Sequence, residues 1–346
     1  MNDLQNYLIH EFVADYKDGY MSRRDMLRRV LYITGSAASA ASILLALGCG
    51  PSAPSPTPTA AKPAAPPQPK TEAPPSPPPA PAAPSPSPSP AAPAPSPSAG
   101  GSPLSVAAND PAIETASITF PGDGGATIQA YQAKPRGNGP FPLVLVCHEN
   151  AGLVDHIRDV ARRYSKEGYV ACAVDLLSRE GGTAAITDRA QVPALLTGGQ
   201  ALPGTRHVSD FQAALKYYTT QSIVRAGAYG MTGFCFGGGI TWLAATKMPE
   251  LKASAPHYGP PPPVADAANI KAAMLGVYSS DPQDFANNGR EALEAALKQA
   301  NVTYQFKVYP GTQHGFNNDT GQRYNEQQAL AAWKDVQEWF TKYPKA

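Results

Sequence analysis

The fold of this chain is decided by residues 226–239, A-G-A-Y-G-M-T-G-F-C-F-G-G-G. An apolar run suited to a buried strand leads into Cys235, and glycines stand two positions before and two positions after that cysteine. A strand that turns at once into a helix strains the residue at the turn, and side chains two positions away would collide with their neighbours. The pattern is typical of a strand–nucleophile–helix elbow with cysteine as the nucleophile. The alternative is an ordinary tight turn around a buried structural cysteine.

On both sides of this stretch, short apolar runs alternate with segments of helical periodicity. Strands are predicted at residues 117–120, 127–133, 143–147, 169–174, 226–231, 253–258, 273–278 and 304–309. Helices are predicted at residues 157–167, 208–218, 240–245, 289–300 and 326–343. Continuous apolar strands separated by helices indicate an α/β fold in three layers, with a mostly parallel sheet covered on both faces. In such sheets the chemistry lies where strands end.

Two later strand ends carry the partners that a nucleophilic cysteine needs. His314 follows the last predicted strand in the loop P-G-T-Q-H-G-F and is the candidate general base, with a surface histidine as the alternative. The run 273–278 is followed by S-S-D-P-Q-D, so the triad carboxylate is expected there. Asp281 is preferred because it is nearer the strand end. Asp284 stays open, and the carboxylate that is not used would cap the next helix.

The third predicted strand ends in H-E-N-A-G-L, where this architecture places an oxyanion donor. The backbone amides of Asn150 and Phe236 are the expected pair. Glu149 at an apolar strand end is expected to raise the pKa of the nearby thiol and restrain it until substrate arrives. Phe234 and Tyr258 are expected to contact the substrate.

The first 49 residues read as an export signal. Arg23-Arg24 precedes a mildly apolar stretch of 18 residues, 30–47, and Leu45-Ala46-Leu47-Gly48-Cys49 resembles a lipoprotein processing site. Residues 1–20 show no obvious fold. We expect twin-arginine export, a lipid on Cys49, and a location outside the cytoplasmic membrane. An uncleaved single-span anchor is the alternative.

Residues 50–104 form a linker rich in Pro, Ala and Ser, which holds 22 of the 38 prolines. The hydrolase-like domain is expected at 105–346. Beyond residue 103 the chain has 21 basic and 21 acidic residues, so nucleic acid is not an expected partner. The four cysteines lack zinc spacing, and no metal or cofactor is expected. A monomer is expected.

From about residue 117 to 343 the chain resembles the dienelactone hydrolase family. The resemblance rests on L-V-L-V-C-H-E-N-A-G-L at 143–153, A-V-D-L-L-S-R at 173–179, G-F-C-F-G-G-G at 233–239 and Y-P-G-T-Q-H-G-F at 309–316. It implies a triad of Cys235, His314 and Asp281, and hydrolysis of an ester or enol-lactone through a thioester. It also implies that Glu149 holds the resting thiol.

The chain departs from the family pattern in two places. The spacing from Tyr278 to Asp281 is one residue shorter than usual, which keeps Asp284 open as the acid. The family arginine four residues after the histidine, which holds a substrate carboxylate, is Asn318 here, and Arg323 lies nearby as a candidate substrate-binding residue.

The predicted function is hydrolysis of a small-molecule ester or lactone by an exported or membrane-anchored enzyme. A general carboxylesterase or thioesterase is the near alternative. A non-catalytic ligand-binding domain of hydrolase fold, tethered at the cell surface, is the alternative from another class.

Overall fold

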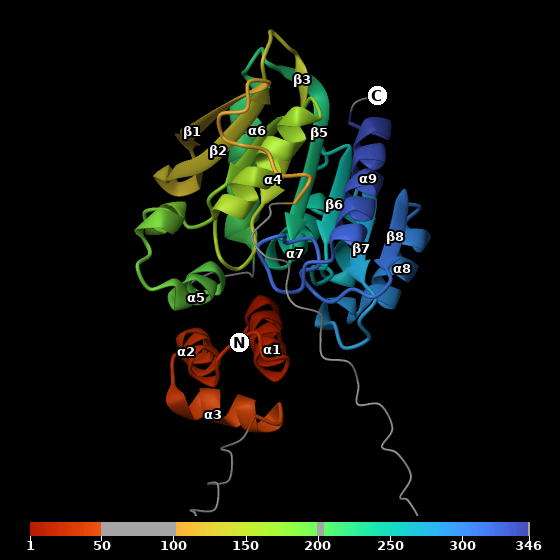
Figure 1. Ribbon diagram of the computed structural model, residues 1–346. Coiled ribbons are helices and arrows are strands. Elements are labelled where there is room, and N and C mark those ends of the chain that lie inside the picture. The colour runs from red at the N-terminus through yellow and green to blue at the C-terminus, as the bar shows by residue number, and fades with distance from the viewer. Residues whose placement is uncertain (50–101, 199–203, 345–346) are drawn as a thin grey trace, which may run out of the picture. The chain divides into compact units, whose positions relative to one another are not determined.

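The computed structural model describes residues 1–49, 102–198 and 204–344. Within them, eight strands form one mixed sheet in the order β1-β2-β4-β3-β5-β6-β7-β8 (Figure 1). Their bounds are β1 Ile113–Pro121, β2 Thr127–Pro135, β3 Phe141–Cys147, β4 Val170–Val174, β5 Val224–Phe234, β6 Ala253–His257, β7 Ala273–Ser279 and β8 Tyr304–Tyr309. Each predicted strand is confirmed, with its ends displaced by a few residues.

The sheet is parallel from β4 through β8, and β1 and β2 are its antiparallel edge. The central strands β3 and β4 are buried along almost their whole length, which explains why they read as continuous apolar runs. The parallel strands end at the same edge of the sheet, so the loops after β3, β5, β7 and β8 come together there.

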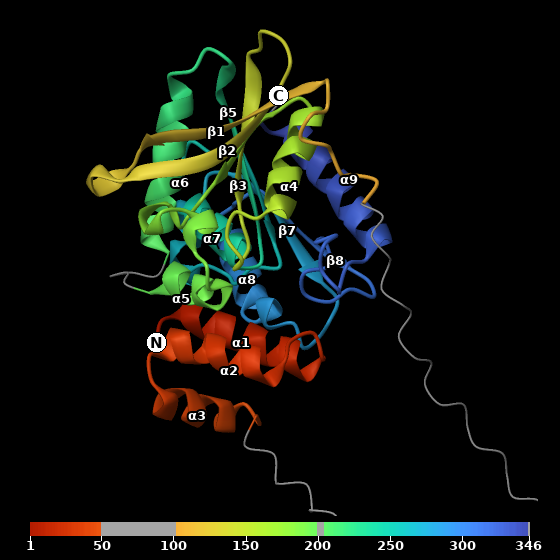
Figure 2. The same cartoon turned by 60° about the vertical axis from the view of Figure 1, so that its left-hand side comes forward.

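Helices cover both faces of the sheet, as Figures 1 and 2 show. Helices α4 (Asp155–Lys166) and α9 (Glu326–Lys342) share one face, where Tyr164 contacts Trp333 with ring centroids 4.8 Å apart. The other face carries α6 (Thr205–Thr219), α7 (Phe236–Ala245) and α8 (Arg290–Gln299). The predicted α/β class and its helices are therefore confirmed, and a short α5 (Val192–Thr197) is added.

The N-terminal segment is folded, which corrects the expectation that residues 1–20 lack a fold. Helix α1 spans Asp3–Lys17, α2 spans Arg23–Thr34 and α3 spans Ala37–Ala46. Asn2 begins α1 with a capping box that includes Gln5. The three helices belong to the same compact unit as the sheet and lie at the edge where β5 ends (Figure 2).

Among the described residues, no single helix is long and apolar enough to cross a membrane. Helices α2 and α3 taken together are long and apolar enough for a membrane span, but a bend of 118° separates them. The predicted linker lies outside the described residues except for its last three positions.

Candidate active site

Cys235 stands alone between β5 and α7, with φ 57° and ψ −121°. A Cβ on Gly233 would lie 2.2 Å from the carbonyl oxygen of Gly237, and one on Gly237 would lie 2.4 Å from that of His148. Only glycine can therefore occupy either flank, as predicted. The turn aims the thiol at the edge of the sheet where β5 ends, next to the N-terminus of a helix.

His314 lies in the loop after β8 and faces the thiol. A ring nitrogen of His314 and Sγ of Cys235 lie within 4.8 Å of each other. Nδ1 of the ring is 3.1 Å from Oδ1 of Asp284. The imidazole thus joins the thiol on one side to a buried carboxylate on the other, although 79 residues separate it from Cys235 in the chain.

The expectation that Asp281 contacts the imidazole is corrected, since Asp284 makes this contact. Asp281 is partly exposed, and its carboxylate accepts the backbone amide of Gln283. Asp284 caps a short 3-10 helix by accepting the amide of Ala286, and it also accepts the hydroxyl of Ser279 at 2.5 Å. Asp284 therefore both contacts the imidazole and caps the following helix, whereas the sequence analysis assigned one of these roles to Asp281 and the other to Asp284.

The loop after β3 supplies the opposite wall of the site. Glu149 accepts the side-chain amide of Asn318 at 2.7 Å and lines the same cavity as Cys235. Asn150 follows it, and Phe236 is the first residue of α7, so its backbone N–H is among those without an acceptor inside the helix.

The structure places the three residues predicted to contact substrate, Phe234, Tyr258 and Arg323, in different surroundings. Phe234, the last residue of β5, lines a separate cavity with His257 and Trp333 and does not line the cavity around Cys235. Tyr258 is fully buried and does not line that cavity either; its ring packs 5.0 Å from that of His314. Arg323 lines the cavity and pairs with Asp15 at 2.6 Å and Asp18 at 2.9 Å.

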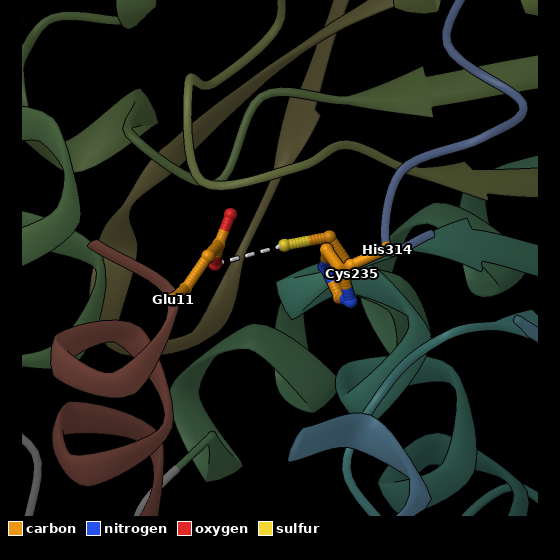
Figure 3. Close-up of side chains that lie close together, drawn as sticks. All are labelled: Glu11, Cys235 and His314. Atoms are coloured by element: carbon orange, nitrogen blue, oxygen red, sulfur yellow. Dashed lines mark hydrogen bonds between the residues drawn. The ribbon is translucent and has the colours of Figure 1, made fainter. Parts of the chain in front are cut away.

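Two residues of α1 that the sequence did not indicate also reach the thiol. Sγ of Cys235 donates to Oε2 of Glu11 at 3.2 Å, the contact drawn in Figure 3. The hydroxyl of Tyr7 lies 3.7 Å from Sγ and 3.4 Å from Nε2 of His314. The apolar spacing Leu4, Leu8 and Phe12 was the available signal for an amphipathic helix.

A cavity of about 250 Å³ lies next to the thiol. Its walls come from α1, from the loop after β3 and from the segment that follows β8. Cys235 is 3% exposed and His314 is 7% exposed, so the reactive atoms are almost fully covered.

Burial and negative charge keep the thiol protonated. Burial raises the pKa of Cys235 well above its ordinary value, and the carboxylates of Glu11 and Glu149 raise it further. Burial also raises the pKa of Glu11, to about 7. The thiol is therefore the hydrogen-bond donor in its contact with Glu11.

The imidazole and its carboxylate stabilise each other's charged forms. Burial alone would lower the pKa of His314, but the charge of Asp284 and the hydrogen bond to it raise that pKa overall. Burial alone would raise the pKa of Asp284, and the contact with His314 lowers it. This pairing holds the ring in one orientation, with Nε2 on the side of the thiol and of the Tyr7 hydroxyl.

Within the described residues, Glu11, Cys235 and His314 are the group whose donor atoms could hold a metal ion, since these atoms lie within 4.8 Å of one another. The spacing of the cysteines along the chain did not indicate this group, because its members come from three distant segments.

Comparisons with known proteins identify the family of the chain. The model of the dienelactone hydrolase family matches residues 128–344. A protein of Methylorubrum extorquens assigned the name carboxymethylenebutenolidase is 35% identical over 226 residues, 62% of this chain and 77% of the relative. An Escherichia coli protein assigned the same name is 34% identical over 257 residues, 70% of this chain and 93% of the relative. A crystal structure assigned as a dienelactone hydrolase from Klebsiella pneumoniae has a TM-score of 0.61 at 33% identity and covers 67% of this chain and 100% of its own.

The raised pKa of Glu11 predicts how the stability depends on pH. Between pH 4.5 and about 7 the folded chain holds a proton on Glu11 that the unfolded chain has released, so stability falls as the pH rises. Glu11→Gln removes this loss. We expect the variant to melt about 6–12 °C above the wild type at pH 8, the shift for roughly 3 kcal/mol in a domain of this size, and to match it near pH 4.

The groups that face Glu11 are Cys235, His314, Asp15 and Glu149, and all of them are unchanged in this variant. Asp3→Asn, on an exposed part of the same helix, is the control and should leave the pH profile as in the wild type. Identical profiles for the wild type and Glu11→Gln would contradict a buried Glu11 carboxylate.

Proposed function

The chain belongs to the dienelactone hydrolase family and is a hydrolase of the carboxymethylenebutenolidase type, and from that premise we propose that it cleaves an ester or lactone through Cys235, His314 and Asp284. The observation that carries the proposal is the position of His314. Its ring lies between the carboxylate of Asp284 and the thiol of Cys235, which is the order of groups that nucleophilic catalysis needs.

In the first step the thiol proton passes to Nε2 of His314, and the thiolate attacks the carbonyl carbon of the substrate. A carbon–sulfur bond forms, and the carbonyl oxygen becomes an oxyanion. The backbone amides of Phe236 and Asn150 donate to that oxygen, and one such donor is typically worth about 3 kcal/mol. Asp284 keeps the proton on Nδ1 and stabilises the imidazolium.

In the second step the carbon–oxygen bond of the ester breaks, and the leaving oxygen takes the proton from Nε2. For a lactone, the leaving oxygen remains attached to the same acyl chain. His314 then deprotonates a water molecule that attacks the thioester. The tetrahedral intermediate collapses, the acid product leaves, and the thiol regains its proton.

Glu149 is proposed to restrain the thiol between turnovers. Its carboxylate contributes to the raised pKa of Cys235 and is held in place by Asn318. An incoming substrate carbonyl that stabilises negative charge near sulfur would overcome this restraint.

We further propose that the chain is exported by the twin-arginine route and anchored through a lipid on Cys49. Arg23 and Arg24 are exposed at the start of α2, which supports recognition by an export receptor.

Cys235→Ala is expected to lower kcat/KM for p-nitrophenyl acetate by roughly 10³-fold or more, because the thioester no longer forms. Cys172→Ala, in the middle of β4, is the control and should keep the wild-type rate. Ester hydrolysis at the wild-type rate by Cys235→Ala would reject this mechanism.

Asp284→Asn and Asp281→Asn distinguish the two candidate acids. Asp284→Asn is expected to lower kcat by about 10²–10⁴-fold, because an amide does not stabilise the imidazolium or its tautomer. Asp281→Asn should change kcat less than about threefold, since its carboxylate contacts a backbone amide and not the ring. Melting curves check that both variants fold, and the reverse ranking of kcat would exclude Asp284 as the acid.

Export is tested by Arg23→Lys with Arg24→Lys, which should leave the chain in the cytoplasm because a twin-arginine receptor reads the guanidinium pair.

Cys49→Ala should abolish incorporation of a radiolabelled fatty acid. Labelling that persists in Cys49→Ala would exclude Cys49 as the lipidation site.

A further inference from the structure

Helix α1 lies over the candidate active site and contacts its reactive atoms from a segment far away in the chain. Tyr7 and Glu11 point at Cys235, and one turn further along the helix Asp15 reaches Arg323. Figure 3 shows Glu11 directed at the thiol of Cys235. Residues 7, 11, 15 and 18 lie near one face of a helix, so a single face makes all these contacts.

The hydroxyl of Tyr7 occupies the space in front of the general base. It lies 3.1 Å from the carbonyl oxygen of Tyr258 and 3.4 Å from Nε2 of His314. Nδ1 of this ring faces Asp284, so Nε2 is the nitrogen that must receive the thiol proton. The ring of Tyr7 packs edge-on against Phe285 at 4.7 Å, which holds the hydroxyl in this position.

The carboxylate of Glu11 occupies the space that an electrophile needs. Oε2 accepts the thiol of Cys235 at 3.2 Å, and Oε1 accepts the side-chain amide of Asn150 at 2.7 Å. A substrate carbonyl has to come about this close to sulfur, on the side of the loop that contains Asn150. A carboxylate in that place excludes the carbonyl by volume and opposes thiolate formation by its charge.

Further contacts hold the N-terminal helices in place outside the reactive atoms. Arg323 pairs with Asp15 and Asp18 of α1, and its guanidinium lies 4.4 Å from the ring centroid of Tyr20. On α2, Arg28 pairs with Asp188 at 2.7 Å, and the hydroxyl of Tyr32 donates to the same carboxylate.

We propose that residues 1–48 are an intramolecular inhibitor, with α1 docked in the substrate cleft, and that the enzyme becomes more active when this segment is displaced or removed. The inference rests on the proposed hydrolysis at Cys235 and adds its regulation. Helices α1, α2 and α3 all end before Cys49, so a cut in front of Cys49 would remove every contact described above. The chain before processing has low activity, and the processed chain is more active.

The test uses the full chain and weakens the docking of α1 by replacing its ion pairs with charge repulsion. Asp15→Lys with Asp18→Lys places two lysines against Arg323, and Asp3→Lys on the exposed start of the same helix is the matched control. Two rates are measured for each protein, the alkylation of Cys235 by iodoacetamide and the hydrolysis of p-nitrophenyl acetate. Both rates are expected to rise at least tenfold in the double variant and to stay at the wild-type level in the control.

Charge reversal of the partner provides a rescue. Adding Arg323→Asp to Asp15→Lys and Asp18→Lys restores opposite charges and should return iodoacetamide alkylation toward the wild-type rate. Iodoacetamide is neutral, so this readout does not depend on any role of Arg323 in binding substrate.

A second variant opens the site without relying on helix release. Tyr7→Ala with Glu11→Ala removes both side chains that contact the thiol, and it should raise both rates even if α1 stays docked. Amide hydrogen exchange in residues 3–17 reports whether the helix is docked in each protein.

Unchanged or lower rates in Tyr7→Ala/Glu11→Ala would overturn the inference, because α1 would then be neutral or needed for activity. If a variant is alkylated faster but still does not hydrolyse the ester, the result would support the blocking of Cys235 by α1 and would reject the proposed hydrolysis.

Discussion

The structure depends on the backbone at Cys235, which adopts a positive φ between β5 and α7. This conformation is costly for a residue with a side chain, and it persists because Gly233 and Gly237 leave no Cβ in the way. The turn presents the thiol at the edge where the parallel strands end. The loops after β3, β7 and β8 then bring the remaining groups of the site to the same place. The strained turn thus determines where the chemistry can happen.

Electrostatics at this site oppose reaction while α1 is docked. Two carboxylates, Glu11 and Glu149, raise the pKa of a thiol that burial already disfavours as an anion. His314 and Asp284 form a charge-stabilised pair, so the base is oriented and ready. The same cleft therefore holds the groups proposed for catalysis together with the carboxylate of Glu11, which we propose blocks them. This combination is expected of an enzyme whose activity is withheld until its N-terminal segment leaves.

The predictions of local structure were confirmed where they rested on patterns among neighbouring residues. The strands, the elbow and the positions of His314 and Glu149 follow from apolar runs and from residues next to strand ends. The acid was wrong because Asp281 and Asp284 are three residues apart in one loop, and the path of that loop decides which carboxylate meets the ring. Phe234 is next to Cys235 in sequence but lines a different cavity, because the chain turns sharply at Cys235.

The sequence by itself determined the α/β class, the elbow and the histidine that serves it, because glycine restrictions and strand periodicity act within a few residues. Tertiary structure alone decided that Asp284 meets His314 and that Tyr7 and Glu11 cover the thiol. Residues 11 and 235 are brought together by the packing of an amphipathic helix against the edge of the sheet. No local pattern encodes that contact, since the amphipathic face of α1 specifies burial but not the surface that buries it.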